Sequence, residues 1–236
     1  MEVLGDVINA TRPKDISELL AYPARHSGMR DGMKVLDCGS GVCGPAIYFA
    51  SNFNVDIECL NLSEVQLKIA REKIKHAHLK GSINLTKTDY NLFPSLFKPE
   101  TFDLVYFIEA FCYCRDPNQL LVDLYDVIKP GGTLYIKDLF LKDDLRLVNP
   151  ELHRIIVKKI NDHYATQLTE AMNEIENVKI IFERSPFKVE FIRRPLYEND
   201  NYLTYAAYQG MNDLVGDIND VFNVIDFFEI KATKPL

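Results

Sequence analysis

The sequence predicts an α/β protein with a doubly wound, mostly parallel sheet. Short apolar runs alternate with longer amphipathic stretches over the first two-thirds of the chain, as in strand–helix–strand units. The run from Phe102 to Ile108 is apolar apart from Asp103, which is typical of a central parallel strand buried on both faces. A glycine-rich segment follows the first run, where such a sheet passes into its first helix. Parallel strands connected in this way need right-handed crossovers.

Length and composition favour a single domain over residues 1–236. Hydrophobic residues make up 47% of the chain, enough for a sizeable core, and the net charge of -7 disfavours a nucleic-acid partner. Residues 1–15 lack the pattern of a signal peptide, and no apolar run approaches the ~20 residues of a membrane span. The five cysteines show no CxxC spacing, which favours reduced thiols. We therefore expect a cytoplasmic protein, monomeric or homodimeric.

The predicted elements follow in chain order. Strands are expected at residues 34–36, 55–60, 83–88, 102–108 and 133–137, and helices at 45–52, 63–79 and 120–128. Pro45 suits the first turn of its helix, where a backbone N–H has no partner in any case. Ser63 is expected to cap the following helix with its side-chain oxygen. The segment Lys129–Gly132 is predicted to be a turn before the fifth strand.

The remainder of the chain, residues 141–236, has a less regular pattern. Helices are expected at 150–161, 166–175 and 202–215, and strands at 178–183, 188–192 and 227–232. We interpret this part as the end of the same sheet together with a lid. Its aromatic side chains predict either a hydrophobic pocket or ordinary core packing, and they are Tyr164, Tyr197, Tyr202, Tyr205, Tyr208 and Phe222.

The sharpest local signal is the glycine-rich segment from Val35 to Gly44. Spaced glycines between a strand and a helix let the backbone approach a ligand closely, although this pattern also fits a dinucleotide site. Asp37 precedes the first glycine, and its charge would repel a pyrophosphate but suits a cationic ligand. Asn61 stands where a dinucleotide site has an acid for the ribose. The segment therefore favours a positively charged ligand over a nicotinamide dinucleotide.

In combination, these features resemble the class I S-adenosylmethionine-dependent methyltransferases. The resemblance covers residues 33–137 and the ending 227–235, and it rests on the glycine turn, Asp89 after the third strand, the apolar fourth strand and the Lys-Pro-Gly-Gly segment. It implies a seven-stranded, Rossmann-like sheet with a helical lid in the C-terminal part. It also implies an N-terminal helical segment (1–32), a cofactor-binding core (33–140), and a lid with terminal strands (141–236).

The resemblance further implies which residues bind S-adenosylmethionine. They are Asp37, Gly39, Ser40, Gly41, Asn61, Leu62, Gln66, Asp89, Tyr90 and Ile108. The glycines would lie under the methionine part and Asp37 would hold its ammonium group, while Asn61 would donate to and accept from the ribose hydroxyls. Leu62 would pack on the adenine and Tyr90 would cover the ring edge. Asp89 would accept from the adenine amine, or else be a simple turn residue.

Two further segments indicate a branch of this family. Asn61–Gln66 is similar to the N/T-L-S-x-x-Q segment of the sterol side-chain, prenyl diphosphate and cyclopropane-forming C-methyltransferases. Ile108–Tyr113 is similar to the I-E-A-x-C-H segment of the sterol enzymes, with tyrosine in place of histidine. The resemblance thus implies methyl transfer to carbon of a small apolar or isoprenoid acceptor. If the acceptor is a prenyl diphosphate, Arg193 or Arg194 becomes a candidate phosphate contact.

Such a reaction places positive charge on the acceptor, which then loses a proton. It needs aromatic faces, a carboxylate and a base. The candidate catalytic residues are Glu109, just after the fourth strand, Tyr113 and His163. Each has a structural alternative: Glu109 bonded to backbone amides, Tyr113 packed in the core, and His163 solvated. No metal site is expected, because His76 and His78 face different sides of a helix.

Other functions remain open from the sequence alone. An N- or O-methyltransferase of a small polar amine or hydroxyl would use the same cofactor. A protein that binds the cofactor without catalysis would also carry the glycine turn. An RNA methyltransferase is disfavoured by the acidic charge.

Overall fold

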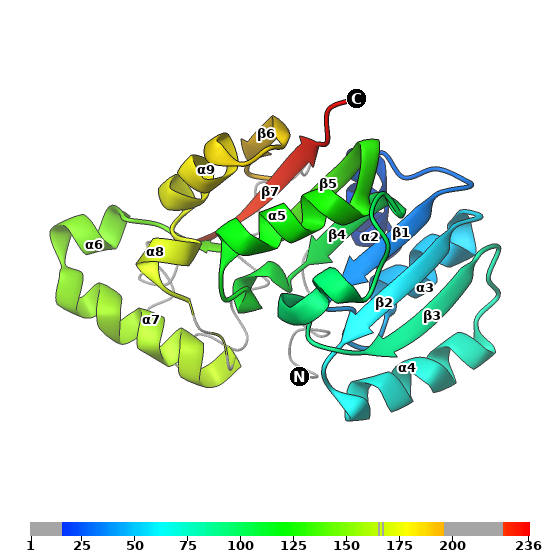
Figure 1. The fold of residues 1–236 in the computed structure, drawn as a ribbon. Coiled ribbons are helices and arrows are strands. Elements are labelled where there is room, and N and C mark those ends of the chain that lie inside the picture. The colour runs from blue at the N-terminus through cyan, green and yellow to red at the C-terminus, as the bar shows by residue number, and fades with distance from the viewer. Residues whose placement is uncertain (1–15, 165, 167, 196–223) are drawn as a thin grey trace.

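A seven-stranded sheet forms the centre of the molecule in the computed structural model, which describes residues 16–164, 166, 168–195 and 224–236. The strands are β1 (Lys34–Cys38), β2 (Asp56–Asn61), β3 (Ser82–Lys87), β4 (Phe102–Ile108), β5 (Ile128–Leu141), β6 (Lys188–Arg193) and β7 (Ile225–Thr233). Their order is β3-β2-β1-β4-β5-β7-β6 (Figure 1). Strands β1 to β5 pair with one another in parallel, and β7 runs antiparallel to β5 and β6. The doubly wound, mostly parallel sheet is thus confirmed.

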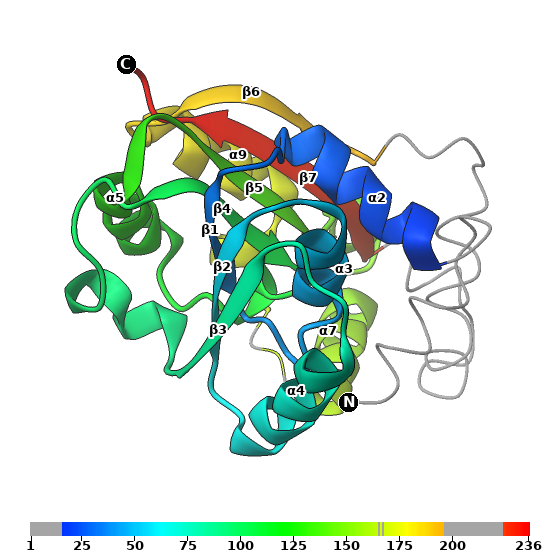
Figure 2. The same cartoon turned by 90° about the vertical axis from the view of Figure 1, so that its right-hand side faces the viewer.

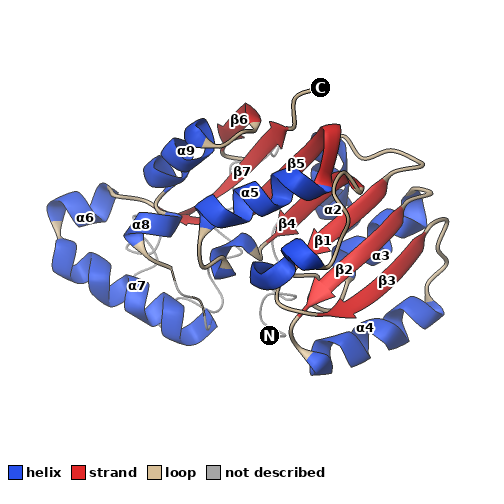
Figure 3. Cartoon of the chain, in the orientation of Figure 1, coloured by secondary structure: helices blue, strands red, loops and turns tan. Residues whose placement is uncertain are grey.

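Helices cover both faces of this sheet (Figure 3). The α-helices of the described residues are α2 (Ile16–Ser27), α3 (Gly44–Asn52), α4 (Glu64–His76), α5 (Pro117–Val127), α6 (Asp144–Val148), α7 (Pro150–Tyr164), α8 (Glu170–Asn173) and α9 (Ile175–Arg184). Two short 3-10 helices, η1 (Tyr90–Ser95) and η2 (Phe111–Tyr113), follow β3 and β4. Apolar side chains of α5 and α9 pack on one face, and those of α2, α3 and α4 on the other (Figure 2).

Helices α6 and α7 lie beyond one end of the sheet rather than over a face (Figure 1). They share a smaller apolar cluster with the ends of β5 and β7, through Leu145, Ile156, Leu141 and Ile225. No helix among the described residues is long and apolar enough to cross a membrane.

Most predicted elements are confirmed with small shifts of their ends, but three predictions in the second half are wrong. Residues 178–183, predicted as a strand, lie in α9, because Ile175, Val178 and Phe182 are buried at helical spacing. The predicted helix 166–175 is reduced to the short α8. The predicted turn Lys129–Gly132 belongs to β5, whose pairing with β4 is irregular there. The helix expected at 202–215 and the aromatic residues between 197 and 222 lie outside the described residues.

Candidate cofactor and active site

The glycine turn joins β1 to α3 at the carboxyl ends of the parallel strands. Gly39 has a φ of 93°, and the amides of Gly39 and Ser40 donate to the carbonyl of Leu60 at 3.0 and 2.9 Å. A Cβ on residue 39 would lie 2.5 Å from the Cβ of Ala110, in the segment after β4. Both the left-handed conformation and this close approach require glycine here. The turn is therefore pressed against the segment that carries Glu109.

Beside this contact, the turn leaves a polar group without a partner. The hydroxyl of Ser40 is buried and has no hydrogen-bond partner within the described part of the chain. An unsatisfied buried hydroxyl costs free energy, so such a group commonly marks a place for a ligand. Gly41 has a φ of 55°, and a Cβ added there meets nothing within 4 Å. The turn thus combines open space with an unused donor and acceptor, which fits a polar ligand such as the expected cofactor.

Asp37 lies at the end of β1, under the turn, with its carboxylate buried. Its Oδ2 accepts a hydrogen bond of 2.8 Å from the Tyr106 hydroxyl and a weaker one from the Cys59 thiol. Burial raises the pKa of Asp37 to about 7, against the lowering effect of these two donors. A cation brought close would favour the ionised carboxylate. This arrangement suits a partner with an ammonium group.

Asn61, at the end of β2, faces the turn with its amide. Its Nδ2 donates to the carbonyl of Gly41 at 3.1 Å and to Oε1 of Gln66 at 3.0 Å. Both amide hydrogens are thereby used, so Oδ1 is the group left to face a ligand. The expectation that Asn61 both donates and accepts is wrong in this respect, because it offers only an acceptor, as a carboxylate would.

The start of α4 completes this side of the site. The side chain of Ser63 accepts from the amide of Gln66 at 3.4 Å, which confirms the predicted N-cap. Leu62, just before it, is 63% exposed. An apolar side chain left in solvent next to the polar side chain of Asn61 is a suitable platform for a flat ring.

Asp89 and Tyr90 follow β3 and have different surroundings. Oδ1 of Asp89 accepts from the backbone and side-chain nitrogens of Asn91, both at 2.9 Å, so the alternative of a turn residue describes part of its role. Tyr90 is buried under the glycine turn, where its hydroxyl donates to the carbonyl of Ala110 at 2.7 Å. It therefore supports the turn from below, and the predicted contact with a ring edge does not match this position.

Glu109 is held in an unusual conformation directly after β4. Its φ is 55°, a left-handed value that costs a non-glycine residue on the order of 1–3 kcal/mol. Its amide donates to the carbonyl of Lys137 at 2.8 Å, and its Oε1 lies 3.4 Å from Nζ of the same lysine. The side chains of Glu109 and Lys137 are 11% and 2% exposed. The carboxylate is paired with a buried ammonium group, and not with backbone amides as the structural alternative supposed.

Two further charged residues near the site, Lys137 and its neighbour Asp138, were not predicted from the sequence. Asp138 is buried, its Oδ1 accepts from the amide of Leu139 at 2.7 Å, and its Oδ2 accepts from the amide of Cys112 at 3.1 Å. Burial raises the pKa of Asp138 to about 7. Asp138 thus fixes the start of η2. Two adjacent charged residues inside an otherwise apolar strand were the signal that could have identified this pair.

The other predicted catalytic residues are placed less directly. Tyr113 ends η2 half-exposed, and partial burial raises its pKa, with Cys112, Asp138 and Glu109 adding to the shift. The backbone of His163 lies in the last turn of α7, and its side chain is outside the described residues. Ile108 ends β4 and is partly buried against the apolar cluster on the α2, α3 and α4 face of the sheet.

The two candidate phosphate contacts are already paired. Nε of Arg193 lies 2.7 Å from Glu229, and Arg194 lies 2.5 Å from Asp226. Both carboxylates are buried, so in this structure the two arginines balance charges of the protein itself.

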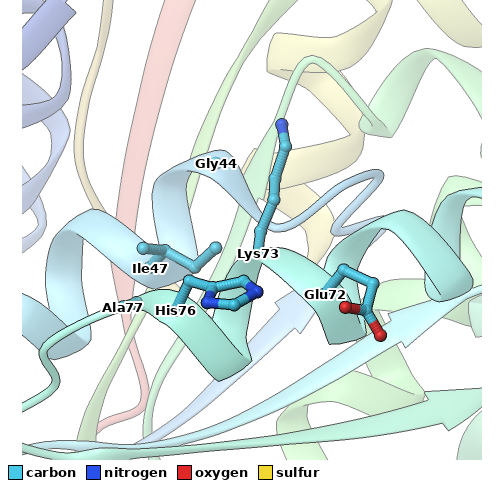
Figure 4. Close-up of a pocket in the computed structure, with 6 residues that line it drawn as sticks. All are labelled: Gly44, Ile47, Glu72, Lys73, His76 and Ala77. Atoms are coloured by element: carbon cyan, nitrogen blue, oxygen red, sulfur yellow. The ribbon is translucent and has the colours of Figure 1, made fainter.

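A shallow groove between α3 and α4 lies apart from these residues (Figure 4). Its lining consists of Gly44, Ile47, Glu72, Lys73, His76 and Ala77. None of the predicted site residues lines it, so it is not part of the candidate site.

The sheet order, the glycine turn and the groups around it are those expected of a class I methyltransferase domain. Residues 36–136 match the family described as a methyltransferase domain. This segment of the chain is thus similar to methyltransferase domains, and the cofactor that this class uses is S-adenosylmethionine.

Curated relatives point in the same direction. The chain is 34% identical over 134 residues to cycloartenol-C-24-methyltransferase 1 of Oryza sativa subsp. japonica, which covers 57% of this chain and 38% of that protein. It is also 34% identical over 139 residues to sterol 24-C-methyltransferase of Saccharomyces cerevisiae, covering 59% and 36%. The matches thus span less than two-fifths of the length of these relatives.

A solved structure extends the similarity to most of the fold. Geranyl diphosphate C-methyltransferase from Streptomyces coelicolor A3(2) superposes with a TM-score of 0.74, covering 92% of this chain and 80% of that one. The sequence identity is 14%, so this similarity concerns the fold alone.

Proposed function

We propose that this protein transfers a methyl group from S-adenosylmethionine to a carbon atom of a small, apolar or isoprenoid acceptor. The observation that carries the proposal is the position of Glu109. Its carboxylate is fixed at the carboxyl end of β4, and the next residue, Ala110, packs against Gly39 of the glycine turn. Cofactor site and carboxylate are therefore neighbours. The relatives named for C-24 methylation support carbon as the acceptor atom.

The cofactor would be held by residues with unused or exposed groups. Asp37 provides a buried negative charge for the ammonium group, and Ser40 an unpartnered hydroxyl. Asn61 provides an acceptor for a ribose hydroxyl, Leu62 an apolar platform, and Asp89 an acceptor for the adenine amine. When bound, S-adenosylmethionine supplies an electrophilic methyl group on a sulfonium.

The chain's own residues would then act on the acceptor. The acceptor's electron pair would form a new carbon–carbon bond with the methyl group while the bond from that methyl to sulfur breaks, and S-adenosylhomocysteine would leave. Positive charge then develops on the acceptor, and the Glu109 carboxylate stabilises that charge electrostatically. The half-exposed ring of Tyr113 provides an aromatic face for the same charge. A carbon–hydrogen bond of the acceptor then breaks, and its electron pair neutralises the cation while a base takes the proton. Glu109 and His163 are the candidates for this base.

The test is a transfer assay with a methyl-labelled cofactor. Pooled isoprenoid alcohols and diphosphates, amines and hydroxyl compounds are offered, and products are treated with phosphatase and extracted with solvent. We expect label in the apolar phase, and a loss of at least about 100-fold in turnover for Glu109→Gln, with cofactor binding retained. Glu183→Gln, at an exposed position of α9, is the matched control.

The other outcomes identify the alternatives. Label confined to the aqueous phase would show an N- or O-methyltransferase. Tight binding of the demethylated cofactor without transfer to any acceptor would show a cofactor-binding protein without catalysis. The cytoplasmic location and the monomeric or homodimeric state stay predictions.

A further inference from the structure

We propose that Arg115 is a positioning residue that presents the Asp89 carboxylate to the adenine and ties it to the segment bearing Glu109 and Tyr113. This inference rests on the proposed cofactor site. It assigns a function to the exposed loop after η2, which no part of the proposed mechanism uses.

The carboxylate of Asp89 can accept one hydrogen bond more than the structure shows. Its Oδ1 accepts two bonds from Asn91, and its Oδ2 accepts a bond of 2.7 Å from NH2 of Arg115. A carboxylate has about four lone-pair positions, so these three donors leave one acceptor position, on Oδ2. A single N–H donor fits that position. A carbonyl oxygen placed there would point its lone pairs at those of Oδ2, with no hydrogen between the two oxygens. The arrangement therefore selects an amino group, as on adenine, over an oxo group.

Arg115 also joins two segments of the chain. The backbone N–H of Arg115 donates to Oδ1 of Asn91 at 2.9 Å, and Nδ2 of Asn91 donates to the carbonyl of Tyr113 at 3.3 Å. The segment after β4 is thereby tied to the segment after β3 at successive points. When adenine fixes the position of Asp89, these contacts also restrict the motion of the segment that carries Glu109 and Tyr113.

The ion pair of Arg115 and Asp89 lies near the surface. The Arg115 side chain is 61% exposed and that of Asp89 is 12% exposed. An ion pair with such an exposed partner contributes little to the stability of the fold. Removing the guanidinium therefore frees the carboxylate to rotate without disrupting the core, which makes its role measurable.

The experiment compares two ligands by calorimetry on the full chain: S-adenosylhomocysteine, and S-inosylhomocysteine, which has an oxo group in place of the amine. We expect the wild type to prefer the first by about tenfold or more, the effect of one well-placed hydrogen bond to a charged group. In Arg115→Ala this preference falls to about twofold and the affinity for S-adenosylhomocysteine falls several-fold. Arg115→Lys should retain most of the ligand preference and most of the affinity for S-adenosylhomocysteine. Lys179→Ala, which removes an exposed pair with Glu176 of 2.7 Å, is the matched control.

Hydrogen exchange gives a second readout that a merely structural role would not move. Peptides covering residues 109–115 should become protected when S-adenosylhomocysteine binds the wild type, and less so in Arg115→Ala. Unchanged preference and unchanged protection in Arg115→Ala would overturn the proposal and leave a simple surface ion pair. An equal loss of affinity for both ligands, with a lowered melting temperature, would also overturn it.

The result of this binding experiment does not depend on whether the proposed methyl transfer to carbon is correct. The binding experiment needs no acceptor and no turnover, so it stands even if the methyl group goes to nitrogen or oxygen. If neither ligand binds the wild type, the cofactor site is wrong and the inference falls with it.

Discussion

Gly39 shows how far the site depends on a single backbone position. Alanine there would combine a φ of 93° with a Cβ placed 2.5 Å from that of Ala110. We expect Gly39→Ala to lower the free energy of unfolding by about 2–3 kcal/mol and to abolish cofactor binding, because the turn must move. Gly41→Ala is the comparison, since its φ of 55° is strained but its surroundings are open, and about 1 kcal/mol is expected. Equal effects of the two variants in denaturation and calorimetry would contradict this interpretation of the turn.

The pair of Glu109 and Lys137 makes a second prediction at this scale. Lys137→Met leaves a buried carboxylate without its partner, which is expected to cost about 3–5 kcal/mol of stability. The double variant Glu109→Gln with Lys137→Met should recover much of that stability in urea denaturation, but not the methyl transfer. If the two changes simply add in stability, the ion pair is not coupled as the structure indicates.

The residues that could be predicted are those marked by local pattern. Asp37, Gly39 and Glu109 can be recognised because each lies at or just after the end of a strand that the same short segment of sequence predicts. Lys137 could not be paired with Glu109 in the same way, because the partners are 28 positions apart, one directly after β4 and the other within β5. The acceptor-only role of Asn61 depends on where Gly41 and Gln66 meet its amide, which is a matter of packing.

Helices and strands were predicted correctly where the spacing of apolar residues matches one type of element only. The cap at Ser63 and the parallel strands of the first half are local or fully buried features. The segment Val178–Phe182 has four apolar residues among five, so its composition suits a strand, but its burial follows a helical period in α9. The antiparallel position of β7 is set by long-range pairing, which no short pattern records.

The attachment of α2 to the sheet makes a prediction about pH. The Tyr22 hydroxyl donates to the buried Glu229 at 2.8 Å, and Nδ1 of His26 lies 3.0 Å from NH2 of Arg193. Burial lowers the pKa of His26, so the folded state favours the neutral ring, whose Nδ1 accepts from the arginine. The contribution of this contact is present above the ordinary histidine pKa of 6.5 and is lost as the pH falls below it. Hydrogen exchange should show α2 opening more readily at acidic pH, and no change there would contradict the attachment.

At the scale of the whole molecule, two buried carboxyl groups govern part of the stability. Burial raises the pKa of both Asp37 and Asp138 from 3.8 to about 7. The folded state holds these protons more tightly than the unfolded chain, so their contribution to stability is present at low pH and is lost as the pH rises toward 7. Asp37→Asn and Asp138→Asn should each gain stability relative to the wild type as the pH rises over this range.

Urea denaturation at about pH 5 and about pH 8 measures this difference. Glu183→Gln, an exposed carboxylate, is the control and should follow the wild type at both values. A stability difference between Asp37→Asn and wild type that does not change with pH would show that Asp37 is not buried in this way.

The overall architecture could be inferred because alternation of strands and helices leaves few arrangements of a parallel sheet. The proposed division into an N-terminal segment, a cofactor-binding core and a lid remains a prediction. The acceptor is not specified by the sheet, since the same fold serves different chemistries and the site alone decides.

The identity of the atom that receives the methyl group is the sharpest test of the proposed reaction. S-adenosylmethionine labelled with carbon-13 in its methyl group is incubated with the protein and an isoprenoid acceptor, and the extracted product is examined by NMR. We expect a methyl signal coupled to a neighbouring carbon of the acceptor, absent with Glu109→Gln. A methyl signal on oxygen or nitrogen, or a carbon-methylated product formed equally well by Glu109→Gln, would contradict the proposed reaction.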